Sequence, residues 1–180
     1  AVGTGQAIKN MKNCDVDVLI THAKEAELEF LKTGYGLARF EFMYNHWVII
    51  GPGKAKRENK FGSYEMREIL KKIYDDKEKF ISRGDNSGTH MKELSIWKEL
   101  ALEPEDFPET WYLETGSGQG ATLMIASEVG AFTITDTATW HSFNIKVDTE
   151  IIGRDNNDLN TYSITTINPK KCKNIKYRAV

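Results

Sequence analysis

Residues 81–93, ISRGDNSGTHMKE, gather an arginine, two serines, a threonine, a histidine and two glycines and lead into a run rich in helix formers. Serine and threonine are typical of helix starts, where they cap the first turn, and glycine lets the backbone approach a neighbour closely. Arg83 adds a planar guanidinium that can hold two oxygens at once. The stretch therefore predicts a short strand that turns into a helix, with one arginine at the turn.

Three functions would explain such a turn. The Arg-Gly-Asp tripeptide at 83–85 could serve cell adhesion, but adhesion needs an exposed loop tip. Ser82, Ser87 and His90 could serve hydrolysis, which needs a nucleophile held against a base, and the chain has no G-x-S-x-G turn. An anion could be held by the unpaired N–H groups at the helix start. The residues favour the last function over the first two, but they equally allow simple helix capping.

The remaining chain alternates between strand and helix patterns, which indicates an α/β fold. Strands are predicted within 15–22, 38–53, 79–82, 111–115, 131–136 and 160–168, and helices within 24–34, 63–76, 89–100 and 119–129. Glycine-rich turns at 2–8 and 115–123 also lead into helices, although neither has the spacing of a dinucleotide-binding or P-loop motif. Three such turns favour an anion site, because ligands bind at these ends of an α/β sheet.

Composition excludes several classes of protein. The 180 residues carry a net charge of −2 with no basic run, so a nucleic-acid partner is not expected. No apolar run is long enough to cross a bilayer, and no two of the four histidines have the spacing of a zinc motif. The two cysteines, Cys14 and Cys172, are compatible with a disulfide or with free thiols.

Several strings of residues, in the order in which they occur, resemble the tungstate-binding proteins of ABC transporters, within the periplasmic solute-binding superfamily. The strings are VGTG (2–5), DVLITHAKEAE (17–27), GYGLARFEFMYNHWVIIGP (34–52), SRGDNSGTH (82–90), WY (111–112), GQGATL (118–123) and AFTITDTATW (131–140). The most specific is the string at 82–90. One departure is Thr137, where the family usually carries arginine.

The resemblance implies a two-lobed α/β fold of the periplasmic binding protein type II, with mixed sheets flanked by helices. Lobe 1 would comprise residues 1–52 plus 139–180, and lobe 2 residues 53–138. The family has further segments before and after the part that this chain resembles, so we expect an incomplete first lobe and weak binding by the chain alone.

The resemblance also implies that the chain is not an enzyme but a binding protein, periplasmic or extracellular, which captures tungstate or molybdate between its lobes for an ABC permease. A monomer is expected, without a cofactor, and the metal would arrive as its oxyanion rather than on side-chain ligands. The implied oxyanion ligands are Arg83, Ser87, Gly88, Thr89 and Ser82 on the second lobe, with Thr4 and Gly5 on the first. A ligand-sensing regulatory domain, another anion such as phosphate, and a membrane anchor outside this chain stay open as alternatives.

Overall fold

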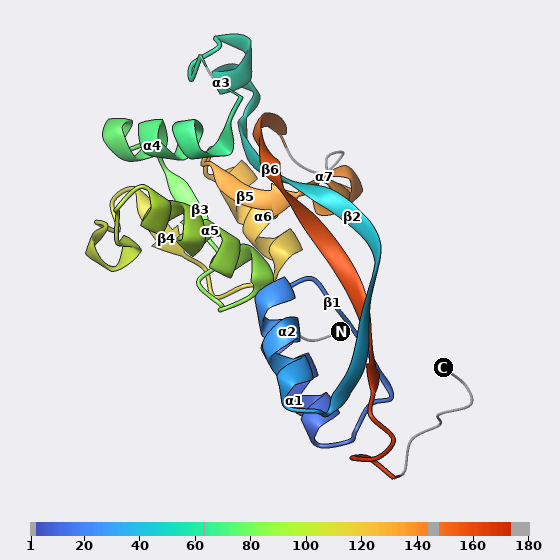
Figure 1. Ribbon diagram of the computed structural model, residues 1–180. Helices are drawn as coiled ribbons and strands as arrows, with labels where there is room; N and C mark the ends of the chain where they lie inside the picture. The colour runs from blue at the N-terminus through green and yellow to red at the C-terminus, as the bar shows by residue number, and fades with distance from the viewer. Residues whose placement is uncertain (1–2, 63, 144–147, 174–180) are drawn as a thin grey trace. The chain divides into compact units, whose positions relative to one another are not determined.

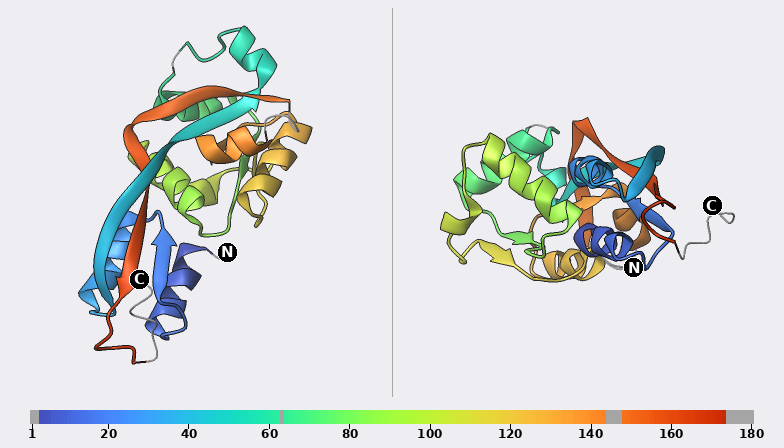
Figure 2. Two further views of the ribbon diagram at one scale, coloured as in Figure 1. Left: turned by 90° about the vertical axis from the view of Figure 1, so that its right-hand side faces the viewer. Right: turned by 60° about the horizontal axis from the view of Figure 1, so that its bottom comes forward.

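The computed structural model describes residues 3–62, 64–143 and 148–173. The chain forms two compact units, residues 1–44 with 160–180 (unit 1) and residues 45–159 (unit 2). Two long strands, β2 (Gly36–Pro52) and β6 (Thr149–Ile167), contribute residues to both units, as the chain can be followed in Figures 1 and 2. The lobe boundaries predicted at 52/53 and 138/139 stay a prediction. The divisions at 44/45 and 159/160 fall inside β2 and β6. Because each strand continues across its division, no loop or change of composition in the sequence indicates these positions.

Unit 1 packs two helices against its strands. It contains α1 (Thr4–Lys12), β1 (Val18–Thr21), α2 (Lys24–Lys32) and parts of β2 and β6. Strand β1 pairs antiparallel with β6, from Val18 opposite Thr166 to Thr21 opposite Ser163. Helix α1 packs against both β1 and α2 (Figure 1). The sheet order over both units is β1-β6-β2-β5.

The core of unit 1 includes one cysteine of a disulfide. Met11, Leu19, Phe30 and Ile167 form a buried apolar cluster together with Cys172. Cys172 is bonded to Cys14, with 5.5 Å between the two Cα atoms. Of the two states that the sequence allowed for the cysteines, the structure shows the disulfide.

Unit 2 contains most of the helices. Its elements are α3 (Gly53–Arg57), α4 (Met66–Asp76), β3 (Phe80–Ser82), α5 (Gly88–Glu99), the 3₁₀ helix Pro104–Asp106, β4 (Tyr112–Glu114), α6 (Gln119–Glu128), β5 (Thr133–Asp136) and α7 (Thr137–Phe143). The elements α4, β3, α5, β4, α6 and β5 occur in the predicted order, which confirms the α/β class, whereas α3, the 3₁₀ helix and α7 were not predicted. No helix among the described residues is long and apolar enough to cross a membrane.

Strand directions in unit 2 bring the segments that follow three strands to one edge. Strand β3 pairs parallel with β4, from Phe80 opposite Tyr112 to Ser82 opposite Glu114. Phe132, which directly precedes β5, forms a parallel bridge with Phe80 of β3, so β5 begins in the same direction as β3. The segments that follow β3, β4 and β5 therefore start at the same end of these strands, where α/β folds commonly bind ligands.

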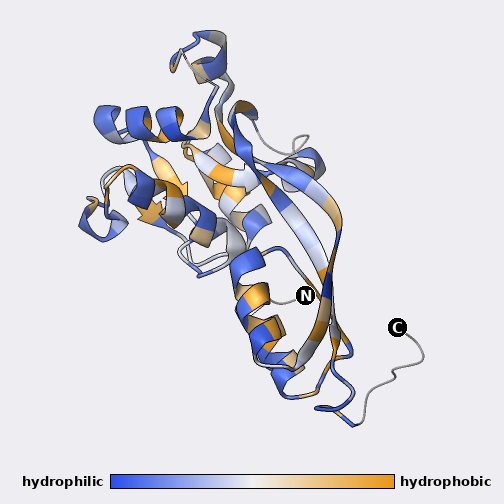
Figure 3. Ribbon diagram, viewed as in Figure 1, coloured by the Kyte–Doolittle hydropathy of each residue, from blue (hydrophilic) through white to orange (hydrophobic). Residues whose placement is uncertain are grey.

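Two helices of unit 2, α4 and α5, bury different kinds of side chain. On α4, the predicted stripe of Met66, Ile69, Leu70 and Ile73 is buried, while Figure 3 shows much of the helix as hydrophilic. On α5, apolar residues recur at every third position, but an α-helix has 3.6 residues per turn, so such a row drifts around the helix. Met91 is consequently 55% exposed, and the acidic Glu93 is 2% exposed instead.

Candidate functional site

The five site residues predicted on the second lobe lie in one segment of unit 2. Ser82 ends β3, Arg83 lies in the loop that follows, Ser87 is the N-cap of α5, and Gly88 and Thr89 are its first two residues. The short loop places all five at the edge where the parallel strands end.

Thr4 and Gly5 belong to the other unit of the chain. They are the first two residues of α1, and they belong to unit 1. Their N–H groups are at a helix start, as the sequence indicated, and their contribution to an oxyanion site stays a prediction.

Arg83 is held in place by three acceptors. Its Nη1 donates to Gln119 Oε1 at 2.8 Å, its Nη2 to Asp85 Oδ2 at 2.5 Å, and its Nε to the carbonyl oxygen of Ser117 at 3.4 Å. The side chain is 15% exposed. A guanidinium has five N–H donors, so these contacts orient it and leave two donors for an external acceptor.

Gln119 joins the elements around the arginine. Its Oε1 accepts from both Arg83 Nη1 and Thr89 Oγ1, the latter at 2.7 Å, and its Nε2 donates to Thr135 Oγ1 at 2.7 Å. Gln119 is the first residue of α6, so one amide connects α5, α6, β5 and the Arg83 loop. Sequence reasoning did not select Gln119, although it lies in the matched string at 118–123, because a polar residue is ordinary at a helix start.

The start of α5 supplies further donors. Ser87 Oγ accepts the N–H of His90 at 3.4 Å, so Ser87 caps the helix, and its O–H also stabilises the Asp85 carboxylate. The N–H groups of Gly88 and Thr89 point out of the first turn without partners inside the helix, at the positive end of the helix dipole. Capping and anion binding are therefore compatible at this position.

Asp85 balances the charge of Arg83. Its Oδ1 accepts the N–H of Ser87 at 3.1 Å, and its Oδ2 accepts from Arg83. Burial favours the neutral acid, but the hydrogen bonds from Ser87 and the charge of Arg83 outweigh it and hold the pKa of Asp85 below its ordinary value. Since Arg83 and Asp85 bind each other, this tripeptide does not present the two free charged side chains that adhesion requires.

The ring of His90 supports the backbone instead of a nucleophile. Its Nδ1 accepts the N–H of Asn86 at 3.1 Å, while Ser82 Oγ donates to Glu93 Oε2 at 2.8 Å. Ser87 bonds the backbone of His90 and not its ring. Neither Ser82 nor Ser87 thus donates to the ring of His90 as a nucleophile would to its base in hydrolysis.

Gly84 is required by the shape of this loop. Its φ is +57°, and a Cβ added there would lie 2.6 Å from Glu114 Cβ. We expect Gly84→Ala to lower the free energy of unfolding by about 2 kcal/mol, measured by urea denaturation, from left-handed strain plus steric overlap. Gly116→Ala is the matched control, because Gly116 has a φ of +61° and nothing within 4 Å of an added Cβ. Equal losses in the two variants would show that the contact with Glu114 is unimportant.

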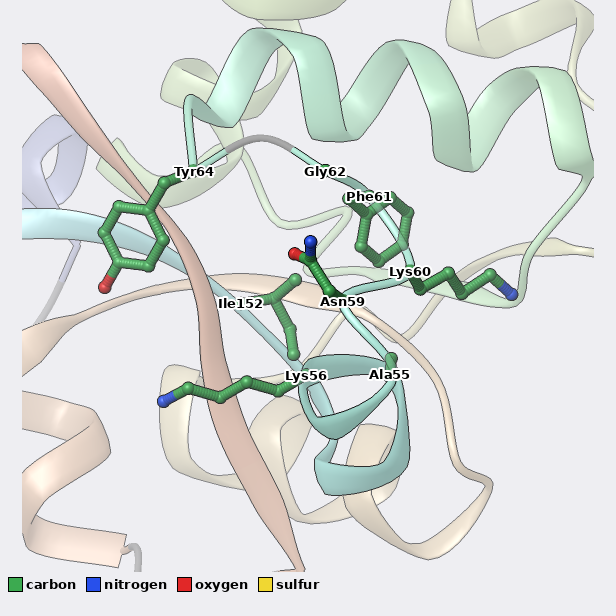
Figure 4. Close-up of a pocket in the computed structure, with 8 residues that line it drawn as sticks. All are labelled: Ala55, Lys56, Asn59, Lys60, Phe61, Gly62, Tyr64 and Ile152. Carbon is green, nitrogen blue, oxygen red and sulfur yellow. The ribbon is translucent and has the colours of Figure 1, made fainter.

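A separate surface pocket lies elsewhere in unit 2. It has a volume of about 360 Å³ and is lined by the residues in Figure 4: Ala55, Lys56, Asn59, Lys60, Phe61, Gly62, Tyr64 and Ile152. Its two lysines are paired with Glu150 and Glu78. The Arg83 loop is the better candidate site for an anion, because it adds the N–H groups at the start of α5 to its cation, whereas the two lysines of the pocket are each paired with a carboxylate.

The chain is similar in sequence to two proteins whose names refer to tungstate binding. It is 42% identical to the tungstate-binding protein TupA of Peptoclostridium acidaminophilum, a match over 97% of this chain and 61% of the relative. It is 40% identical to TupA of Campylobacter jejuni, over 98% of this chain and 66% of the relative. The chain thus spans about two thirds or less of the length of these relatives.

A crystal structure gives the same fold. The tungstate ABC transporter protein from Geobacter sulfurreducens superposes with a TM-score of 0.85 at 40% identity, over 99% of this chain and 75% of the other. The family model that describes the PBP superfamily domain matches residues 1–172. The chain therefore belongs to the family of PBP superfamily domains.

Proposed function

We propose that the protein is a solute-binding protein that captures tungstate or molybdate at the Arg83 loop and presents it to an ABC permease, without catalysing a reaction. One observation carries the proposal. Arg83 Nη1 and Thr89 Oγ1, two donors predicted to hold an oxyanion, converge on a single oxygen atom, Gln119 Oε1, at 2.8 and 2.7 Å. An oxyanion oxygen is an acceptor of the same kind, so a small rotation of the amide would let it take that position.

The chemistry of the loop suits a tetrahedral dianion. Removing water from two charges is costly, so a site must replace the water with fixed donors. The N–H groups of Gly88 and Thr89 and the hydroxyl of Thr89 are neutral donors, and Arg83 adds a full charge with two N–H groups still available. Since Asp85 offsets much of that charge, most of the attraction would come from oriented dipoles.

The disulfide supports a location outside the cytoplasm. Bonds such as Cys14–Cys172 persist in oxidising compartments and are rare in reducing ones. A periplasmic or extracellular site is also where a binding protein would meet its anion before a permease does. The similarity to TupA and to the Geobacter sulfurreducens protein supports this place in transport.

Titration of tungstate into the purified chain, followed by isothermal calorimetry, tests the proposal. We expect saturable binding of one anion per chain, with molybdate competing for the same site and phosphate competing poorly. Phosphate differs in carrying a proton near neutral pH, which requires an acceptor, whereas both oxygens of Asp85 are already engaged. If phosphate competed as well as molybdate, the assignment of tungstate or molybdate as the ligand would be wrong. If no anion bound, the proposed function itself would be contradicted.

A further inference from the structure

Glu93 is a buried acid directly beneath the Arg83 loop. It lies on α5 and is 2% exposed. Three side-chain donors meet its carboxyl group: Ser82 Oγ donates to Oε2 at 2.8 Å, and Tyr112 Oη and Trp97 Nε1 donate to Oε1 at 2.7 and 3.2 Å. Burying an acid is costly, and the three donors offset only part of that cost, so neither packing nor helix capping accounts for its presence.

Ser82 connects this carboxyl group to the loop. Its Oγ donates to Glu93 and also accepts the N–H of Gly84 at 3.3 Å. Gly84 follows Arg83 in the chain, so the two bonds of one hydroxyl fix the backbone on both sides of the arginine. Glu93 thus acts on the arginine loop through Ser82, without touching an anion itself.

The protonation state of Glu93 decides how Ser82 uses its hydrogen. When the acid is ionised, the Ser82 O–H must donate to it. When a proton is bound at Oε2, the acid donates to Ser82 Oγ, and the serine hydrogen becomes free for another acceptor. Protonation also removes a buried negative charge that would repel a dianion at the loop. Both effects favour oxyanion binding by the protonated form.

The other ionisable groups around Glu93 do not replace it in this role. Tyr112 and Glu114 face it from β4, and burial beside Glu93 raises the pKa of Tyr112 above its ordinary value, so the phenol stays neutral. The remaining groups on packed elements have other partners: Arg83 with Asp85, His90 with Asn86, Lys92 with Asp155 and Asp158, and Asp136 with Asn45 and Thr139.

We propose that Glu93 is a proton-linked positioning residue of the oxyanion site, whose carboxylate takes up one proton from solvent when the anion binds. The inference rests on the proposed function. Burial, opposed by the bonds from Tyr112, Ser82 and Trp97, raises the pKa of Glu93 to about 7, so both protonation states are populated at neutral pH. A dianion bound nearby shifts that balance further toward the protonated acid.

Calorimetry of tungstate binding in two buffers of different ionisation enthalpy measures the proton uptake. For the wild-type chain at pH 7.5 we expect uptake of a substantial fraction of one proton, and an affinity on the order of tenfold weaker at pH 8.5 than at pH 6. Glu93→Gln should bind tungstate without uptake and with an affinity that changes little with pH. Glu114→Gln is the matched control, because it removes a neighbouring carboxylate and should retain the uptake.

Each result has a distinct meaning. Tungstate binding by the wild type without proton uptake, or uptake that persists in Glu93→Gln, overturns the role of Glu93 and leaves the proposed function intact. Failure of the wild type to bind tungstate overturns the proposed function, and this inference with it. If Glu93→Gln does not fold, carboxyl ¹³C NMR of the wild type decides: the pKa of Glu93 should rise on adding tungstate, and an unchanged pKa contradicts the proposal.

Discussion

Arg83→Ala is expected to weaken tungstate binding by about 3 kcal/mol, on the order of a hundredfold. The substitution removes the guanidinium of the loop, and it leaves the Asp85 carboxylate without its counter-charge. An anion that binds there would then face an uncompensated negative charge as well as the loss of two N–H donors. The effect is measured by calorimetric titration at fixed ionic strength, because salt screens such interactions.

Two further variants make this result specific. Arg83→Lys keeps a charge but loses the planar fork, so its affinity should lie between those of the wild type and Arg83→Ala. Arg67→Ala is the matched control, since Arg67 is an exposed arginine of α4 that contacts the Glu99 carbonyl. An unchanged affinity in Arg83→Ala, or an equal loss in Arg67→Ala, would contradict the assignment of the site.

The stability of the protein is expected to fall as pH rises from about 5 to 7.5. Glu93 has an ordinary pKa of 4.5 and a folded-state pKa of about 7. Between these values the folded protein keeps a proton that the unfolded chain has lost. The stabilising contribution of Glu93 to the free energy of unfolding is therefore full below pH 4.5 and is lost as pH rises through 7. The expected change is on the order of 3 kcal/mol in the free energy of unfolding.

Urea denaturation at several pH values checks this expectation. Glu93→Gln should remove most of the slope, whereas Glu99→Gln, at an exposed position of the same helix, should keep it. The window is separate from that of Asp85, whose lowered pKa affects stability only below its ordinary value of 3.8. A wild-type slope that Glu93→Gln leaves unchanged would show that another group titrates.

Local sequence determined the elements that frame the site. The pattern around 81–93 indicated a strand, a loop and a capped helix, and the structure has β3, the Arg83 loop and α5 with Ser87 as its N-cap. The stripe of α4 and the glycine turn before α6 were likewise predicted. These features depend on residues a few positions apart, through capping bonds and helical periodicity, so they are readable without knowledge of the fold.

Tertiary structure decided which distant residues act together. Gln119 reaches Arg83 only because β3 and β4 are parallel and end at the same edge, and Glu93 becomes a buried acid only because its side of α5 packs onto β3 and β4. Cys14 and Cys172, 158 positions apart, form a disulfide because the packing of unit 1 brings them together. The sequence alone thus determined the arginine loop and its helix start, whereas long-range packing decided the partners that orient the arginine and the acid that links it to pH.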